Sequence, residues 1–177
     1  MSQVTYTIDP THSTAGFKVR HLMVANVKGE FSGVTGTVVY DAENPANSKV
    51  EAKIDATTVH TRDEQRDGHL KSADFFDVEK YPTITFVSTK VEKTGDSEAK
   101  VTGDLTIHGV TKEVVLDVEG PAPEAKDPWG NTRSGASATT KINRTDFGLV
   151  WNAALETGGV LVGEQVSLTL EVELMRM

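Results

Sequence analysis

The chain has 177 residues, with 18 Lys and Arg against 26 Asp and Glu, and a formal net charge of −8. It contains no cysteine, which excludes disulfides, thiolate metal sites and cysteine nucleophiles. The acidic balance argues against a broad surface for nucleic acid or anionic membranes, and the length predicts one domain over residues 1–177.

The N-terminal stretch from Met1 to Ser13 shows no basic region followed by an apolar one, the pattern of a secretory signal. Nowhere do 18 apolar residues follow one another, so the sequence predicts no membrane insertion. We therefore expect a cytoplasmic location.

Alternation of apolar and polar residues dominates the chain and predicts about eight strands. It is cleanest near the C-terminus, where polar residues separate Val166, Leu168, Leu170, Val172 and Leu174. One apolar and one polar face on each strand are typical of antiparallel sheets. The predicted strands are Phe17–His21, Gly36–Tyr40, Val50–Ala56, Ile84–Val87, Val101–His108, Val114–Val118, Ala136–Ile142 and Val166–Leu174.

Only one region favours a helix. Thr61 and Glu64 have the spacing of a capping box, which predicts a short helix over Arg62–Asp67 that ends at Gly68. The segment Ser72–Phe76 could add another turn.

Two segments are expected to be irregular. The Pro- and Gly-rich segment Pro121–Arg133 predicts a long loop, and the glycines at 158, 159 and 163 predict a turn around a short apolar patch. The dipeptide His108-Gly109 predicts a tight turn between two strands.

Eight amphipathic strands can bury their apolar faces in a sandwich or in a closed barrel. A closed barrel has no free edges and can enclose one small ligand. Periodicity alone does not choose between the two arrangements.

Catalytic motifs are weak. The chain has no G-x-S-x-G nucleophile elbow and no phosphate-binding glycine loop. His60, Asp63 and His69 could contribute to a metal site, but the same residues suit a solvated helix, which is the favoured interpretation. Arg62, Arg66 and His69 could bind an anionic group, or pair with the neighbouring carboxylates.

Nearly the whole chain resembles the YceI-like family of bacterial proteins. The stretch Gly103–Lys112 is the most specific part of the resemblance. The other matching blocks are Ile8–Ser13, Phe17–His21, Val27–Phe31, Arg66–Leu70, Asp74–Asp77, Tyr81–Phe86, Arg144–Gly148 and Val162–Val166.

The resemblance implies an all-β fold, an eight-stranded antiparallel lipocalin-like barrel with a short helical segment. It implies binding or carriage of a polyisoprenoid or other long-chain lipid, without catalytic residues, metal or cofactor, and a homodimer. On this view Asp67 and His69 hold the helix against the barrel, and Arg144 pairs with Asp146. Two other functions stay open: an enzyme acting on an apolar substrate through His21 or the Arg62 and His69 region, and a stress-response protein with a filled barrel.

Strand parity and the aromatic residues together predict the residues around the ligand. These are Phe17, Val19, His21, Phe31, Ile54, Phe75, Phe86, Leu105, Ile142 and Trp151. A polar head group at the mouth of the cavity would meet Arg62, Arg66 and His69.

Overall fold

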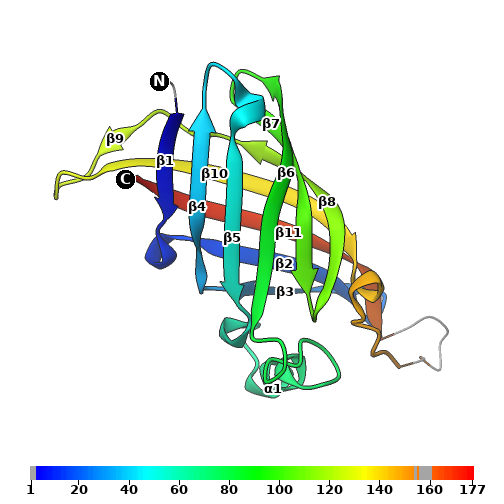
Figure 1. Cartoon of the computed structure of the whole chain (residues 1–177). Helices are drawn as coiled ribbons and strands as arrows, with labels where there is room; N and C mark the ends of the chain where they lie inside the picture. The colour runs from blue at the N-terminus through cyan, green and yellow to red at the C-terminus, as the bar shows by residue number, and fades with distance from the viewer. Residues whose placement is uncertain (1–2, 154, 156–160) are drawn as a thin grey trace.

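In the computed structural model, which describes residues 3–153, 155 and 161–177, an antiparallel sheet curls into a barrel (Figure 1). Helix α1 (Glu64–Lys71) lies at one end of it. The strands are β1 (Gln3–Ile8), β2 (Thr14–His21), β3 (Ala25–Phe31), β4 (Val34–Asp41), β5 (Lys49–Asp55), β6 (Thr83–Gly95), β7 (Glu98–Ile107), β8 (Val110–Glu119), β9 (Ala125–Lys126), β10 (Thr132–Asn143) and β11 (Val162–Arg176).

Strand β11 closes the barrel. One of its edges pairs with β10 along almost its full length. The other edge pairs with β2 and then with β1, so β1 and β2 act as one strand bent at the 3-10 turn Pro10–His12. Strands β4 and β3 flank them in the same way. The ring therefore has eight members, which confirms the predicted barrel: β1/β2, β3/β4, β5, β6, β7, β8, β10 and β11.

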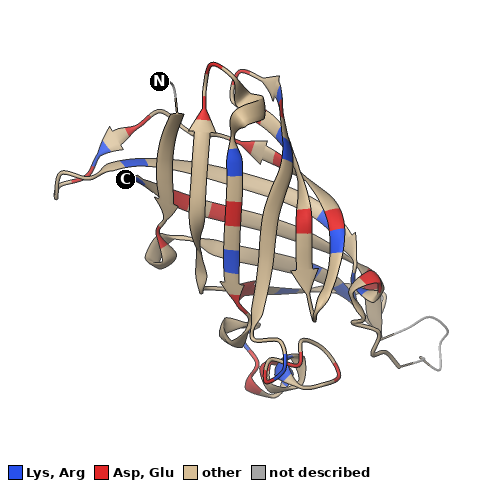
Figure 2. Cartoon of the chain, viewed as in Figure 1, with Lys and Arg blue, Asp and Glu red and all other residues tan. Residues whose placement is uncertain are grey.

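The predicted alternation decides which side chains face inward. Along β11, Leu168, Leu170 and Val172 line the interior, while the residues between them face outward. Charged residues recur on the outward positions of β5 (Figure 2). Because the side-chain period of a strand is two, a register slip of one residue would expose the whole apolar face.

All eight predicted strands are present, and the turn at His108-Gly109 joins β7 to β8 with a positive φ at both residues. The sequence reasoning missed β1 and β3. Strand β1 does alternate Val4, Tyr6 and Ile8, and its last two are buried. It is short because Asp9 and Pro10 end it.

The boundaries and cap of the helix differ from the prediction. Helix α1 begins at Glu64, and the Asp63 side chain, not that of Thr61, accepts a hydrogen bond from the Arg66 N–H. Arg62 has a φ of 67°, outside the helical region. Gly68 lies inside the helix, where a Cβ would meet nothing within 4 Å. Because Gly68 is exposed, packing does not require the helix to end at this residue.

Outside the ring, the predicted loop Pro121–Arg133 contains the two-residue strand β9 and places Trp129 81 % exposed. Of the turn predicted around 158–163, residues 158–160 lie outside the described residues. Helix α1 is too short and too polar to cross a membrane, and none of the described helices could.

Candidate functional site: an apolar cavity

The interior of the barrel encloses a cavity of about 360 Å³. Its wall consists mainly of inward-facing residues of the eight ring strands, joined by residues of α1 and of the connecting segments, and the lining surface is almost wholly apolar. Several of them stay only half-buried because they face this space rather than a packed core, among them Val38, Val50, Ile54, Ala136, Ala138, Leu168, Leu170 and Val172.

Aromatic side chains concentrate at the end of the cavity nearest α1. The ring of Phe31 lies 5.8 Å from Phe17 and 5.4 Å from Phe76, measured between centroids. Phe75 lies 5.4 Å from Trp151, which approaches from the segment before β11. Tilted and edge-to-face contacts of this kind are favourable beyond the area that they bury. They give this end of the cavity a rigid aromatic boundary.

Two glycines make room for aromatic rings in the wall. A Cβ on Gly103 would lie 2.5 Å from the Phe86 ring and 2.6 Å from the Val87 carbonyl oxygen. A Cβ on Gly29 would collide with the Phe17 ring. The absence of these side chains lets both rings lie against the sheet.

The most deeply buried cation of the described chain, Arg144, borders the cavity at 4 % exposure. It belongs to the 3-10 turn Arg144–Phe147, and burial lowers the pKa of its guanidinium. The predicted pair with Asp146 is wrong: among the described residues Arg144 forms no ion pair. Its guanidinium instead donates to four main-chain carbonyls, those of Gly163 (2.8 Å), Leu149 (2.6 Å), Trp151 (3.0 Å) and Val162 (3.3 Å). Arg144 thus ties the segment after the turn to the start of β11.

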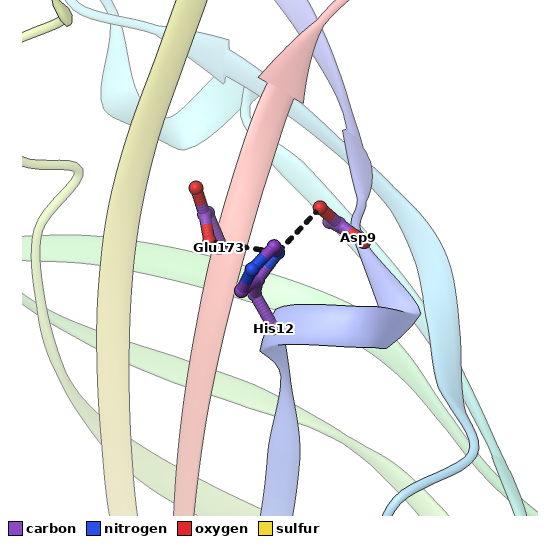
Figure 3. Close-up of side chains that lie close together, drawn as sticks. All are labelled: Asp9, His12 and Glu173. Atoms are coloured by element: carbon purple, nitrogen blue, oxygen red, sulfur yellow. Dashed lines mark hydrogen bonds and ion pairs between the residues drawn. The ribbon is translucent and has the colours of Figure 1, made fainter. Parts of the chain in front are cut away.

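A second polar cluster lies outside the cavity, where β1 turns into β2 (Figure 3). One ligand atom each from Asp9, His12 and Glu173 falls within 4.8 Å of the others, a spacing compatible with a metal ion. However, Arg133 Nη1 lies 2.6 Å from Asp9 Oδ2 and 3.5 Å from Glu173 Oε1. With an arginine already supplying the positive charge, the cluster is best described as an ion-pair network.

Hydrogen bonds set the charge states in this network. Hydrogen bonds from His12, Thr11 and Arg133 to the Asp9 carboxylate hold its pKa well below the ordinary value. The bond to Asp9 and the nearby Glu173 raise the pKa of His12. Both shifts favour the charged forms, so the network joins β1, β10 and β11 most firmly when all its members are ionised.

A family model described as the YceI-like domain matches residues 6–174. The chain belongs to the YceI-like family. A UPF0312 protein of Staphylococcus aureus (strain MSSA476) is 40 % identical over 168 residues, covering 95 % of each chain. A UPF0312 protein of Pseudomonas savastanoi pv. phaseolicola is 42 % identical over 146 residues, covering 81 % of this chain and 76 % of that one.

Solved structures share the barrel. The Campylobacter jejuni YCEI protein superposes with a TM-score of 0.73 at 35 % identity, covering 89 % of this chain and 90 % of that one. Burkholderia cenocepacia BcnA gives a TM-score of 0.79 at 22 % identity, covering 94 % and 98 %. A polyisoprenoid binding domain from Saccharophagus degradans gives 0.72 at 16 % identity, covering 98 % and 99 %. The last two likenesses establish the fold.

In this YceI-like chain, nine of the ten residues predicted around a ligand line the cavity; their part in binding stays a prediction. The exception is Ile142, which lies beside Phe147 at a separate hollow. The reason is that β8 and β10 pair only over three residues, Asp117–Glu119 and Ser137–Thr139. Beyond that point the strands diverge, and Phe147, 1 % exposed, packs near their inner edge.

The three predicted head-group residues separate in the structure. Arg66 lines the cavity, and its guanidinium donates to Thr61 Oγ1 and to the Thr61 carbonyl, both at 2.8 Å. Arg62 is exposed and His69 bonds Asp74 at 2.9 Å; neither belongs to the cavity lining among the described residues.

The two residues expected to fix the helix do so by different contacts. The Asp67 carboxylate accepts two hydrogen bonds, one from the Thr61 N–H and one from the Thr61 hydroxyl. Burial alone would raise the pKa of Asp67, but these hydrogen bonds outweigh it and the pKa is lowered. His69 instead packs edge-on against Phe75 and Trp151, with centroids 5.0 and 4.7 Å apart. Helix α1 therefore contacts the aromatic end of the cavity through the His69 ring, while Arg66 and Leu70 of the same helix line the cavity itself.

Proposed function

We propose that the chain binds one long-chain apolar lipid of the isoprenoid type inside the barrel. The observation that carries this proposal is the cavity of about 360 Å³ with its almost wholly apolar wall. Family membership and the shared fold with the polyisoprenoid binding domain from Saccharophagus degradans support it.

Burial of hydrocarbon supplies the affinity without directional chemistry. Each Å² of apolar surface removed from water contributes roughly 25 cal/mol, from which the costs of association are subtracted. An extended prenyl chain offers CH₂ and CH₃ groups over its whole length. The role that follows is binding or carriage rather than catalysis.

Arg66 is the head-group residue under this proposal, because it alone of the three predicted cations borders the cavity. Affinities for farnesyl phosphate and farnesol test it. In the wild type the phosphate binds more tightly than the alcohol, and Arg66→Ala removes that preference. Arg62→Ala is the matched control outside the cavity and keeps it. Equal affinities in the wild type would show that the hydrocarbon alone determines binding.

Native mass spectrometry tests the main proposal. We expect the folded protein to retain one molecule of geranylgeraniol after incubation, and organic extraction of the purified protein to release a non-polar compound. A spectrum that shows only the 19.1 kDa chain would contradict binding and favour a filled barrel. The proposed homodimer is checked by sedimentation, where a 19.1 kDa species at high concentration would contradict it.

A further inference from the structure

The hairpin between β2 and β3 ends in an exposed apolar tip. Its three turn residues, Leu22, Met23 and Val24, are 44 %, 49 % and 76 % exposed. Leu22 and Met23 have φ values of 53° and 61°, a conformation that Asn and Gly adopt readily and bulky apolar residues rarely. The tip therefore carries large apolar side chains at positions where neither burial nor backbone preference explains them.

A row of lysines crosses the outer face of the sheet behind this tip. Lys141 on β10 pairs with Ser167 on β11, Ser167 pairs with Lys18 on β2, and Lys18 pairs with Lys28 on β3. Directly paired residues share a face, so the three lysines lie on one line across four strands. All three are exposed, and none forms an ion pair with any described residue.

This row is unusual in a chain with a net charge of −8. Like charges directly opposite one another, as in Lys18 and Lys28, destabilise a sheet. Over Thr14–Phe31 the hairpin holds three cations, the third being Arg20, against one carboxylate, Glu30. Figure 2 shows blue segments on β2 and β3, whereas β5 carries both signs.

The tip adjoins the wall of the cavity. Arg20 and His21, which precede it, line the cavity, and so does Leu161, whose carbonyl accepts a hydrogen bond from the Leu22 N–H at 2.8 Å. A further exposed apolar residue, Val150 at 65 %, precedes the cavity-lining Trp151. The apolar tip thus lies at a border of the space that holds the proposed ligand.

We propose that the β2–β3 hairpin docks onto the surface of an anionic lipid bilayer, with its tip among the acyl chains and the lysine row against the head groups. This goes beyond the proposed function, and docking does not depend on what the cavity binds. Apolar residues flanked by cations are typical of interfacial membrane binding. A polyanion such as a nucleic acid would use the lysines alone and leave the apolar tip unexplained.

Co-sedimentation with vesicles tests the proposal. The full chain should bind phosphatidylglycerol–phosphatidylcholine vesicles at least about tenfold more strongly than pure phosphatidylcholine vesicles, with the difference reduced at high salt. Replacing the lysine row by glutamine (Lys18→Gln, Lys28→Gln, Lys141→Gln) should weaken binding about 100-fold, because each cation near an anionic surface adds to the attraction. The matched control replaces exposed lysines elsewhere on the barrel (Lys49→Gln, Lys53→Gln, Lys112→Gln) and should change binding much less.

The tip is tested by a variant that favours the native turn. Leu22→Asn, Met23→Gly and Val24→Ser together install the preferred residues for positive φ while removing the apolar surface. This variant should fold and still bind geranylgeraniol, but lose at least about tenfold in vesicle binding. The control Val87→Ser with Val115→Ser removes apolar residues of 45 % and 44 % exposure far from the tip and should bind as the wild type does.

Three results would overturn the proposal. They are wild-type protein that does not bind anionic vesicles, control variants that lose binding as much as the test variants, and binding that needs the lysines but not the tip. The last would indicate a polyanion surface. Because ligand binding is measured in the same variants, failure of docking is distinguishable from failure of the cavity to bind lipid.

Discussion

Arg133 Nη1 donates a hydrogen bond of 2.6 Å to Asp9 Oδ2, joining residues 124 positions apart in the chain. The same guanidinium bonds Asp127 through Nε at 2.8 Å, so one arginine connects the bend between β1 and β2 to the start of β10 and the loop before it. Arg133 lowers the pKa of Asp127 to about 2. Ionic hydrogen bonds thus add to the apolar packing of the paired residues Ile8 and Leu174 in holding the barrel together here.

This network predicts how stability depends on pH. The lowered pKa of Asp9 means that its contribution is present above its ordinary value of 3.8 and is lost as pH falls toward the folded-state pKa. The raised pKa of His12 means that its contribution is present below 6.5 and is lost as pH rises through the folded-state pKa. We expect Asp9→Asn to unfold at a lower temperature at pH 5 and to show a weaker loss of stability below pH 4.

The matched control is Asp55→Asn. Asp55 makes the same pair of bonds to the N–H and hydroxyl of Thr57 that Asp9 makes to Thr11, but it has no arginine partner among the described residues. Thermal unfolding followed by circular dichroism from pH 2.5 to 8 compares them. If both variants responded to acid as the wild type does, the assignment of acid sensitivity to the Asp9 network would be wrong.

Gly103 predicts a strong response to a single methyl group. In Gly103→Ala the new Cβ would meet both the Phe86 ring and the Val87 carbonyl oxygen, and only the ring can move. We expect the free energy of unfolding to fall by about 1–3 kcal/mol, as in other overpacked interiors. Gly130→Ala tests open space instead, since a Cβ there meets nothing within 4 Å, although its φ of 85° adds some strain. If urea unfolding showed that Gly103→Ala and Gly130→Ala lose the same free energy of unfolding, the packing explanation for Gly103 would be wrong.

Arg144 should stabilise the fold through its hydrogen bonds to main-chain carbonyls rather than through an ion pair with Asp146. Arg144→Met removes the arginine donor from the carbonyls of Gly163, Leu149 and Trp151, whereas the Val162 carbonyl keeps a hydrogen bond from Asn152 Nδ2. Each unsatisfied buried group costs about 1–3 kcal/mol. We expect a fall in the free energy of unfolding of at least about 3 kcal/mol, while Asp146→Asn changes it little. If Arg144→Met and Asp146→Asn lowered the free energy of unfolding by similar amounts, the result would favour the Arg144–Asp146 ion pair that the sequence suggested.

A charge or amide in the cavity wall should weaken the binding of an apolar ligand. Phe86→Asp tests this directly, and Leu170→Gln tests it at a half-buried wall position where the fold tolerates a polar group more easily. We expect at least about tenfold weaker binding of geranylgeraniol in both, from lost apolar contact and a desolvated polar group. Val115→Gln, on the outer face, is the control. Unchanged uptake in folded Phe86→Asp and Leu170→Gln would show that the ligand binds elsewhere.

Residues that follow a strand period were predictable, and residues that depend on distant partners were not. Alternation in β2 and β7 was sufficient to place Phe17, Val19 and Leu105 on the wall. The same parity could have found Leu168, Leu170 and Val172, which were assigned to the strand but not to the site. Ile142 failed because parity does not show where two strands diverge.

The polar contacts needed the folded chain. The spacing of Thr61 and Glu64 correctly indicated a nearby helix, but Thr61 does not cap it. The Thr61 hydroxyl donates a hydrogen bond to Asp67 instead. Arg144 and Asp146 are close in sequence, yet the arginine is used by carbonyls up to 19 residues away. The Arg133–Asp9 bond spans 124 residues, and no local pattern could indicate it.

Fluorescence of Trp151 tests the central claim most directly. The chain has two tryptophans, and Trp129→Phe leaves only Trp151, which lines the cavity beside Phe75. On titration with geranylgeraniol, we predict a saturable change in Trp151 emission that is complete at one ligand per chain and requires at least about tenfold more ligand in Leu170→Gln. A folded protein whose Trp151 emission does not change, or changes without saturating, would contradict binding of a lipid inside the barrel.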